Sequence, residues 1–423
     1  MYSFVVEIHM QGNSLLIGVY VLLHVFVSQL ALGIRMENGS PLASPSNNIS
    51  VLDCGAVGDG LKDDSLAFSK AWEAVCAIIG ETPTLTIPDG PFLLTPVSFQ
   101  GPCNASSIHV QIQGKLVAPE NPETWKNCTD NTWIRFSGID NLILDGSGEI
   151  NGKGANWWHS ANLSFGDNNF DTNSTALQLL SCNGLQLKDL THVDSPNGHI
   201  SIVSCNNATI SNLHIVAPEN SPNTDGIDIS SSTQVQISDS IIETGDDCIA
   251  IGSGTSQLNI TGITCGPGHG ISVGSLGRDG ETAQVEQIHV RNCTFNGSTN
   301  GARIKTWQGG SGYARNITFE DIPLINVENP IIIDQYYCNP GQTCAAQKSA
   351  VAIEGITYKG FQGTSASAAA ISLNCSSTVA CTGITMESIN ITASNPSDKA
   401  FGICINAKGT EDLVVPRVPC FVV

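Results

Sequence analysis

A short phrase recurs along the middle of the chain at a fixed spacing, and it limits the possible folds more than any other feature. The segments 225–229 (DGIDI), 247–251 (DCIAI) and 269–273 (HGISV) align at steps of 22 residues. A fourth match at 301–305 (GARIK) follows an insertion of about nine residues around Gly277 to Gln284. Self-similarity at a period of roughly 20 to 50 residues indicates a stacked repeat architecture.

The runs inside each repeat are β-branched, alternate as strands do, and are too short for helices. A step of 22 residues suits one coil of a parallel β-helix, with three strands and three turns per coil. We therefore predict an all-β fold, a single-stranded right-handed parallel β-helix of about ten coils. A β-propeller is the rival fold, but its blades need roughly 40 or more residues and carry motifs that this chain lacks.

The repeat register also predicts which side chains stack. An aliphatic column should point inward and a mixed column should point outward, because successive side chains alternate along a strand. The inward column comprises Ile227, Ile229, Ile249, Ile251, Ile271 and Val273. The outward column comprises Asp228, Ala250, Ser272 and Arg303.

The segment before the repeats predicts a cap for the open end of the β-helix. Asp64 or Ser65 can start a helix over Leu66–Ile79, whose buried face would carry Ala67, Trp72 and Val75. Terminal units of a stacked repeat need such a cover. No Pro/Ser-rich linker interrupts the interior, so residues 50–423 are interpreted as one domain.

The first residues have a different character. Leu15–Ile34 is mostly apolar and ends on small residues, which predicts a secretory signal at 1–33, cleaved after Gly33, followed by a leader at 34–49. An uncleaved membrane anchor is the alternative, since 20 such residues can span a bilayer. His24 and Gln29 within the run favour the signal. We expect no stable membrane association after cleavage.

Two counts support a secreted, extracellular protein. The chain has thirteen Asn-x-Ser/Thr sequons and 15 Cys, an odd number that leaves at least one thiol free in an oxidising compartment. Short spacings predict the pairs Cys248–Cys265, Cys338–Cys344, Cys375–Cys381 and Cys404–Cys420. Buried thiols are predicted at Cys182, Cys205 and Cys293.

The composition excludes several kinds of partner. Lys and Arg number 18 against 38 Asp and Glu, for a formal net charge of −20. Nucleic-acid binding needs a basic footprint, which this balance does not provide. No CxxC pair or Cys/His cluster indicates zinc. We expect a monomer without a metal or other cofactor.

The repeat places acidic residues above one another. Neighbouring strands lie about 4.8 Å apart, so Asp225, Asp247 and His269 should stack at a bend before each strand, with Asp246 adjacent. Carboxylates this close repel, and at least one should keep its proton above its solution pKa. Acid/base cleavage of glycosides needs such a pair with separated pKa values. The alternatives are turn-forming aspartates or a calcium site.

Two cations lie in the same column. Arg303 and Lys305 are two residues apart on one strand and therefore face the same side. Together they could hold the carboxylate of an anionic substrate, Arg bidentately and Lys as a point charge. The alternative is a surface ion pair, which contributes little.

These residues stand in four short segments that resemble the signature segments of the polygalacturonases, the glycosidases that hydrolyse pectin. The segments are 223–225 (NTD), 245–248 (GDDC), 268–270 (GHG) and 303–305 (RIK). Their order and coil spacing make the set specific, and the likeness covers about residues 50 to 420. The segment GPGHGISVGSLGR resembles the corresponding segment in the plant branch of the family.

The resemblance implies an inverting hydrolysis of homogalacturonan and a role for each matching residue. Asp246 matches the general acid, and Asp225 and Asp247 match the pair that positions and activates water. His269 is expected to sustain the proton state of Asp246. The substrate-binding matches are Arg303, Lys305, Asn223 and Tyr337.

Three other functions stay open on the sequence. A pectate lyase of the same architecture would use calcium and an Arg base, and a non-enzymatic wall protein would bind pectin without cutting it. Xylogalacturonan or rhamnogalacturonan could replace homogalacturonan as substrate. The intact segments favour the hydrolase, and the acid/base roles predict best activity at mildly acidic pH.

Overall fold

The computed structural model describes residues 47–125, 132–158, 175–339 and 344–421. The chain divides into two compact units, Met1–Ser46 and Asn47–Val423, and the fold below is that of the second unit. The predicted signal at 1–33 and most of the leader at 34–49 lie outside the described residues. No helix among the described residues combines the length and the hydropathy that crossing a membrane requires.

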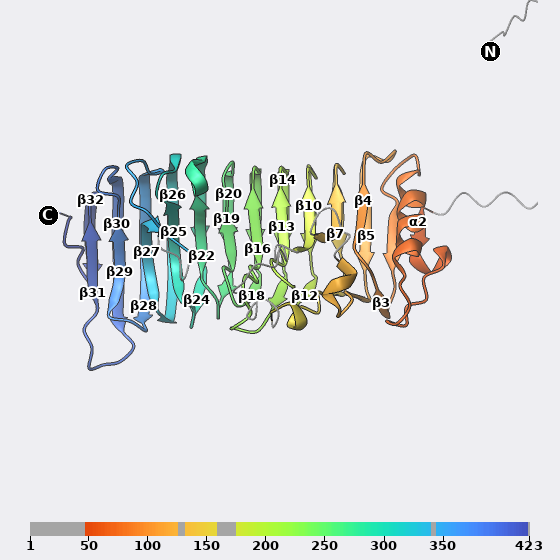
Figure 1. Ribbon diagram of the computed structural model, residues 1–423, viewed down its shortest axis with the longest axis horizontal. Coiled ribbons are helices and arrows are strands. Elements are labelled where there is room, and N and C mark those ends of the chain that lie inside the picture. The colour runs from red at the N-terminus through yellow and green to blue at the C-terminus, as the bar shows by residue number, and fades with distance from the viewer. Residues whose placement is uncertain (1–46, 126–131, 159–174, 340–343, 422–423) are drawn as a thin grey trace, which may run out of the picture. The chain divides into compact units, whose positions relative to one another are not determined.

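The second unit is a right-handed parallel β-helix, as predicted, with coils stacked side by side from helix α2 to strand β32 (Figure 1). Successive coils pair through parallel ladders in two sheets. The eleven strands of one sheet are β4 (Val97–Gln100), β7 (Thr132–Ser137), β10 (Thr175–Leu180), β13 (Ile200–Val203), β16 (Ile227–Ser230), β19 (Ile249–Ile251), β22 (Ile271–Leu276), β25 (Asn300–Trp307), β27 (Asn329–Tyr337), β29 (Ala369–Asn374) and β31 (Phe401–Ile405). Eleven strands in this sheet agree with the expectation of about ten coils.

The second sheet has 21 strands, because the early coils contribute two short strands where the later coils contribute one long strand. They are β1 (Asn48–Ser50), β2 (Thr84–Ile87), β3 (Pro91–Leu93), β5 (Ile108–Ile112), β6 (Lys115–Val117), β8 (Leu142–Asp145), β9 (Glu149–Asn151), β11 (Gln186–Lys188), β12 (Thr191–Val193), β14 (Asn206–Ser211), β15 (His214–Val216), β17 (Thr233–Ser238), β18 (Ile241–Glu243), β20 (Ser256–Thr261), β21 (Thr264–Cys265), β23 (Thr282–Arg291), β24 (Thr294–Asn296), β26 (Ser311–Val327), β28 (Ala352–Ser365), β30 (Cys381–Ala393) and β32 (Ala407–Val415).

Four adjacent coils bend within this second sheet at one residue in the left-handed conformation. Asp189, Asn212, Asp239 and Gly262 follow one another in adjacent coils and have φ values of 61°, 54°, 51° and 69°. Asn, Asp and Gly tolerate this region best, which explains the turn residues between the short runs of the repeat. Asn212 also donates a hydrogen bond of 2.6 Å to Asp189, which joins the bends of these two adjacent coils.

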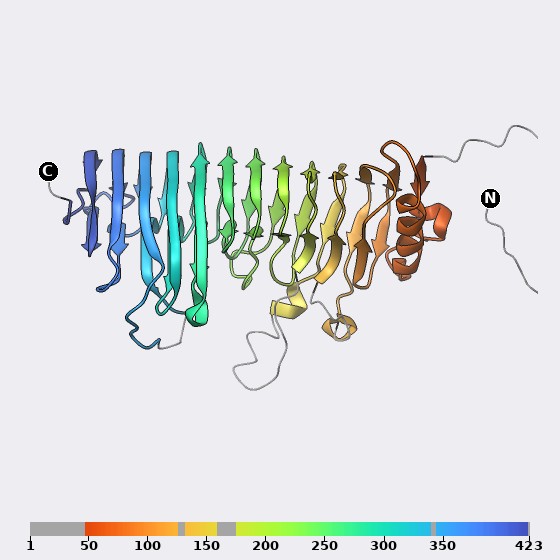
Figure 2. The same ribbon diagram turned by 90° about the horizontal axis from the view of Figure 1, so that it is seen from above.

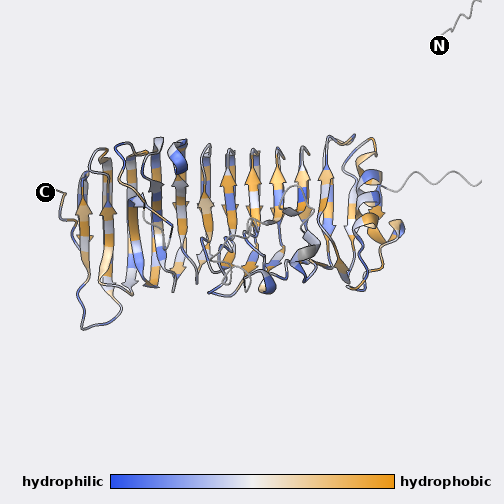
Figure 3. Ribbon diagram, viewed as in Figure 1, coloured by the Kyte–Doolittle hydropathy of each residue, from blue (hydrophilic) through white to orange (hydrophobic). Residues whose placement is uncertain are grey.

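The predicted register of the eleven-stranded sheet is confirmed. Ile227, Ile249 and Ile271 pair in adjacent strands and are fully buried. On the other face, Asp228 pairs with Ala250, Ala250 with Ser272, and Ser272 with Arg303. Apolar and polar residues alternate along the strands (Figure 3), so the apolar set fills the interior of the coils.

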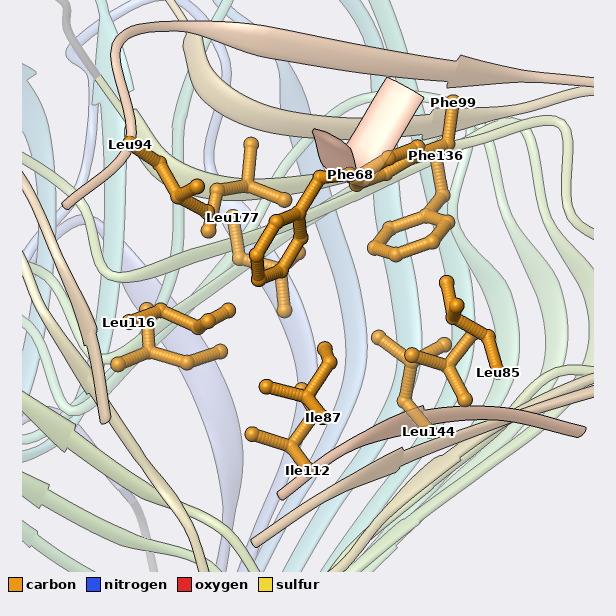
Figure 4. Close-up of a pocket in the computed structure, with 13 residues that line it drawn as sticks. Phe68, Leu85, Ile87, Leu94, Phe99, Ile112, Leu116, Phe136, Leu144 and Leu177 are labelled. Atoms are coloured by element: carbon orange, nitrogen blue, oxygen red, sulfur yellow. The ribbon is translucent and has the colours of Figure 1, made fainter. Parts of the chain in front are cut away.

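Helix α2 (Ser65–Cys76) covers the N-terminal end of the stack (Figure 1). It ends three residues earlier than the predicted Leu66–Ile79, and its buried face includes the predicted Ala67, Trp72 and Val75. Phe68 from this helix closes an interior lined only by apolar side chains (Figure 4). Asp64 precedes the helix but accepts hydrogen bonds from the amides of Val57 and Gly58 at 2.7 and 3.0 Å, so it ties down the preceding loop.

Three short 3₁₀ helices also occur among the described residues: η1 (Val51–Cys54), η2 (Pro122–Trp125) and η3 (Arg278–Gly280). The predicted insertion around Gly277 to Gln284 contains η3 and the start of β23. Figure 2 shows the turn after β22 and the chain after β27 extending from the same side of the stack.

All four predicted disulfides are present: Cys248–Cys265, Cys338–Cys344, Cys375–Cys381 and Cys404–Cys420. A fifth, Cys76–Cys103, joins the end of α2 to a loop and was not predicted, because 27 residues separate its cysteines. Cys182, Cys205 and Cys293 are buried free thiols, as predicted.

Candidate active site

The predicted site residues gather on the outer face of the eleven-stranded sheet. Asp225, the Asp246–Asp247 pair and His269 stand just before β16, β19 and β22, at the bends where the alternation of the strands breaks. A Cβ at Gly245 would collide with the carbonyl oxygen of Ser221 in the preceding coil. Only glycine permits so close an approach of two backbones, and the approach fixes the bend that carries the aspartates.

Asp247 lies at the centre of the site. Its side chain is fully buried, and its Oδ1 accepts hydrogen bonds from Ser272 at 2.8 Å and from Arg303 Nη2 at 2.7 Å. Lys305 Nζ donates to Oδ2 at 2.7 Å. Two cations and a hydroxyl therefore compensate the one buried carboxylate, which is the condition for burying a charge at all.

Asp246 contacts the predicted histidine. Its Oδ1 lies 2.8 Å from His269 Nδ1 and accepts the amide of Asp247 at 2.8 Å. Burial on its own raises the pKa of the Asp246 carboxyl, but the hydrogen bond and charge of His269, together with Lys305, outweigh burial and bring this pKa below its ordinary value.

Two other carboxyls behave in the opposite way. Burial raises the pKa of Asp225 well above its ordinary value, and the negative charges of Asp228, Asp246 and Asp247 raise it further. Burial, with Asp247 and Asp246, also raises the pKa of Asp228 to about 7. The cluster therefore keeps protons at mildly acidic pH, as expected from its crowding, and the free site holds them on Asp225 and Asp228.

The segment before β13 lies against these two aspartates. The backbone amide and Nδ1 of His199 both lie within hydrogen-bond distance of the carbonyl oxygen of Asp225, at 2.8 and 3.1 Å. A Cβ at Gly198 would lie 2.7 Å from Oδ2 of Asp228, so only glycine leaves room for that carboxyl. His199 is buried, and burial lowers its pKa to about 4, which keeps it neutral at mildly acidic pH.

Aromatic side chains border the cations. Lys305 Nζ lies 5.3 Å from the centre of the Tyr337 ring, which meets Trp307 edge to face with 5.1 Å between centroids. The neighbouring Tyr336 uses its hydroxyl to accept the amide of Ser377 in a later coil at 2.8 Å. Of the two tyrosines, Tyr337 is therefore the one that lies beside the predicted cations.

Sequence reasoning placed Asn223 at the same site, and the structure puts it in an exposed left-handed turn two residues before Asp225. Asp228, His199 and Trp307 were not predicted as site residues. Asp228 and Trp307 could have been found, because Asp228 belongs to the outward column and Trp307 continues the alternation of Arg303 and Lys305. The sequence gives no sign that His199 lies at the site, because its contact is with the backbone carbonyl of Asp225 in the next coil.

Asp246, Asp247 and His269 also bring one potential metal-ligand atom each within 4.8 Å of one another. This donor set fits a cation poorly. Both Asp247 oxygens already face Arg303 and Lys305 at 2.7 Å, and these positive charges would repel a metal ion.

Comparison with known proteins places the chain in a family. Residues 76–411 match the model of glycosyl hydrolases family 28. A probable polygalacturonase of Arabidopsis thaliana is 52% identical over 381 residues, which cover 89% of this chain and 81% of that protein.

Solved structures show the same fold. An endo-xylogalacturonan hydrolase from Aspergillus tubingensis superposes with a TM-score of 0.72 at 27% identity, covering 85% of this chain and 96% of that one. An exopolygalacturonase from Thermotoga maritima superposes with a TM-score of 0.71 at 19% identity, covering 92% and 95%.

Proposed function

Because the chain belongs to family 28 of the glycosyl hydrolases, it is a glycoside hydrolase, and we propose that it is a polygalacturonase acting on pectin. The bond cleaved is the α-1,4 link between galacturonic acid units of homogalacturonan. The observation that carries this proposal is one cluster in which acidic groups with separated pKa values adjoin two cations on the same face. The relatives favour hydrolysis over the lyase and binding alternatives.

The catalytic roles follow from which oxygen atoms are available. Asp246 is the general acid and gives its proton to the glycosidic oxygen as the bond from that oxygen to the anomeric carbon breaks. Water attacks the anomeric carbon from the opposite side, so the configuration inverts, and Asp225 takes the proton that the water loses. Asp247 accepts three hydrogen bonds already, so it assists the water only through its remaining lone pairs and its charge.

The proton must move within the cluster when substrate binds. In the free site the raised pKa belongs to Asp225, whereas the reaction needs the proton on Asp246. Substrate covers Asp246 and removes water from it, and burial is the largest influence that raises its pKa. With its pKa raised in this way, Asp246 takes up the proton and leaves Asp225 ionised as the base, while His269 holds the Asp246 carboxyl in place.

Arg303 and Lys305 bind the galacturonate carboxylate with the donors that Asp247 leaves unused. Lys305 uses one of its three N–H groups on Asp247, and Arg303 uses Nε on Ser272 and Nη2 on Asp247. Tyr337 and Asn223 border the same unit of substrate. Asp247 thus fixes the direction of both cations before substrate arrives, which lowers the entropic cost of binding.

We also propose that the protein is secreted to the cell wall as a monomer, without metal or other cofactor. The thirteen sequons and the disulfides support an oxidising, extracellular compartment. A secreted wall enzyme meets its polymeric substrate directly. Mass determination of the protein purified from the secreting tissue would show whether residues 1–33 are removed.

The deciding experiment is digestion of polygalacturonic acid at mildly acidic pH with a chelator present. Release of reducing ends without absorbance from unsaturated product ends is expected for hydrolysis. Oligomers of mixed size indicate endo cleavage, and monomer alone indicates exo cleavage. Unsaturated ends would establish the lyase instead, and folded protein that binds pectin but releases nothing would establish the wall-binding protein.

A further inference from the structure

A second cationic position adjoins the proposed site and has no role in the mechanism above. Arg278 lies in η3, inside the insertion that interrupts the repeat after β22. Its guanidinium carbon lies 5.5 Å from the centre of the Trp307 ring. Trp307 packs on Tyr337, and Tyr337 lies under Lys305, so a continuous row of side chains joins Arg278 to the centre of the site.

Arg278 differs from the other two cations of the site in how much of its side chain is exposed. Arg303 and Lys305 have only 13% and 10% of their side chains exposed, and both pair with Asp247. The Arg278 side chain is 62% exposed, and its ion-pair partner among the described residues is the exposed Asp279 at 3.7 Å. An exposed pair at this distance contributes little, so most of the charge of Arg278 remains available to a ligand.

The turn that carries Arg278 is built against the next coil. Gly277 has φ +77°, and a Cβ there would lie 2.8 Å from both the Gly310 Cα and a Val351 methyl group. The carbonyl oxygen of Glu281 accepts the Ser311 amide at 3.0 Å. These contacts hold the turn on the coil of β25, the strand that bears Arg303, Lys305 and Trp307.

An arginine stacked on an aromatic ring keeps the edge of its guanidinium free for a carboxylate. We propose that Arg278, oriented by Trp307, binds the carboxylate of a second galacturonate unit, next to the unit that Arg303 and Lys305 hold. The inserted turn thereby extends the binding strip by one acidic sugar. This inference rests on the proposed function, because the ligand is the same polymer.

The arrangement also explains how a chain with a net charge of −20 binds a polyanion. Cations confined to one strip, backed by aromatic rings, give a local positive field within an acidic surface. Loss of Arg278 should then weaken ground-state binding and leave the chemical step intact, since Arg278 is separated from Asp246 by the aromatic pair and Lys305.

The test compares Arg278→Gln with a matched control, Arg291→Gln, by steady-state kinetics on polygalacturonate at low ionic strength. Arg291 is an exposed arginine at the end of β23 in the other sheet, and its replacement changes the net charge equally. For Arg278→Gln we expect KM to rise about tenfold with kcat within about twofold, the size of one charge-assisted contact. The KM of Arg278→Lys should lie between those of the unaltered protein and Arg278→Gln. Added salt should reduce the difference in KM between the unaltered protein and Arg278→Gln.

A second measurement uses the Asp246→Asn background to observe binding without turnover. Titration calorimetry with trigalacturonate and with its methyl ester separates charge from shape. Arg278→Gln is expected to weaken binding of the acid about tenfold and to leave binding of the ester unchanged. Trp307→Phe should weaken binding of the acid less than Arg278→Gln does.

Three results would overturn the inference. They are an unchanged KM in Arg278→Gln, an equal rise of KM in Arg291→Gln, and an equal loss of binding affinity for the acid and the ester in Arg278→Gln. These failures differ from failure of the proposed function, in which the unaltered protein itself releases no reducing ends.

Discussion

Lys305 Nζ and Asp247 Oδ2 lie 2.7 Å apart in an ion pair whose side chains are 10% and 0% exposed. The two residues are 58 positions apart in the chain and meet because β19, β22 and β25 stack in register. The pair connects the acidic half of the site to the cationic half.

Breaking this ion pair should cost far more than breaking an exposed one. Lys305→Met leaves the buried Asp247 with fewer compensating donors, so we expect the free energy of unfolding to fall by about 3–5 kcal/mol. Lys359→Met is the control, since Lys359 pairs with Glu320 at the same 2.7 Å but its side chain is 47% exposed. Urea denaturation should show no measurable change for the control. Equal effects of both variants would contradict the role of burial.

Replacing the proposed acid should remove the chemical step. Asp246→Asn keeps the shape of the side chain but cannot donate the proton, so kcat should fall about a hundred- to ten-thousand-fold with little change in KM. Reducing-end release from polygalacturonate measures both constants. Near-normal kcat in a folded Asp246→Asn protein would refute this assignment.

The His269–Asp246 contact should appear in the pH profile. His269→Ala removes the hydrogen bond and charge that most lower the pKa of Asp246, so that pKa should rise. Since the acid acts when protonated, the alkaline limb of kcat/KM should move to higher pH, although the rate falls.

The matched control for this variant is His214→Ala, because His214 contacts Glu243 at 3.2 Å on the second sheet. Its pH profile should coincide with that of the unaltered protein. A limb that stays in place or moves to lower pH in His269→Ala would show that Asp246 is not the group titrating there.

Stability should fall as the pH rises toward neutrality. The folded pKa of Asp228 is about 7, above its ordinary value of 3.8, so the folded protein binds a proton that the unfolded chain releases. That contribution is complete below about pH 4 and is lost as the pH passes through about 7.

Asp228→Asn removes this dependence because an amide does not titrate. Its free energy of unfolding should exceed that of the unaltered protein at pH 8 by on the order of 2 kcal/mol, and the difference should narrow at pH 5. Urea denaturation at the two pH values checks the sign. A difference that grows toward low pH would contradict the raised pKa.

Chelation should not affect activity. The cluster of Asp246, Asp247 and His269 has metal-like spacing, but Arg303 and Lys305 already occupy the Asp247 oxygens. We expect equal rates of reducing-end release before and after dialysis against a chelator. A loss that calcium restores, together with unsaturated product ends, would instead support the lyase.

The sequence by itself determined the repeat and what the repeat implies. The 22-residue step placed Ile227, Ile249 and Ile271 in one inward column and Asp228 and Arg303 in one outward column. Such predictions succeed because a parallel β-helix converts sequence spacing directly into stacking, one coil per repeat. The short-range disulfides were predictable from the short spacings of their cysteines, whereas 27 residues separate Cys76 from Cys103.

Tertiary structure alone decided how the stacked groups interact. The column does not reveal that Asp247 is fully buried against Arg303 and Lys305, or that the raised pKa falls on Asp225 rather than on Asp246. It also does not show Arg278 reaching the Trp307 ring from an insertion outside the repeat. Burial and side-chain direction set charge and contact, and both depend on distances between coils that a linear spacing does not contain.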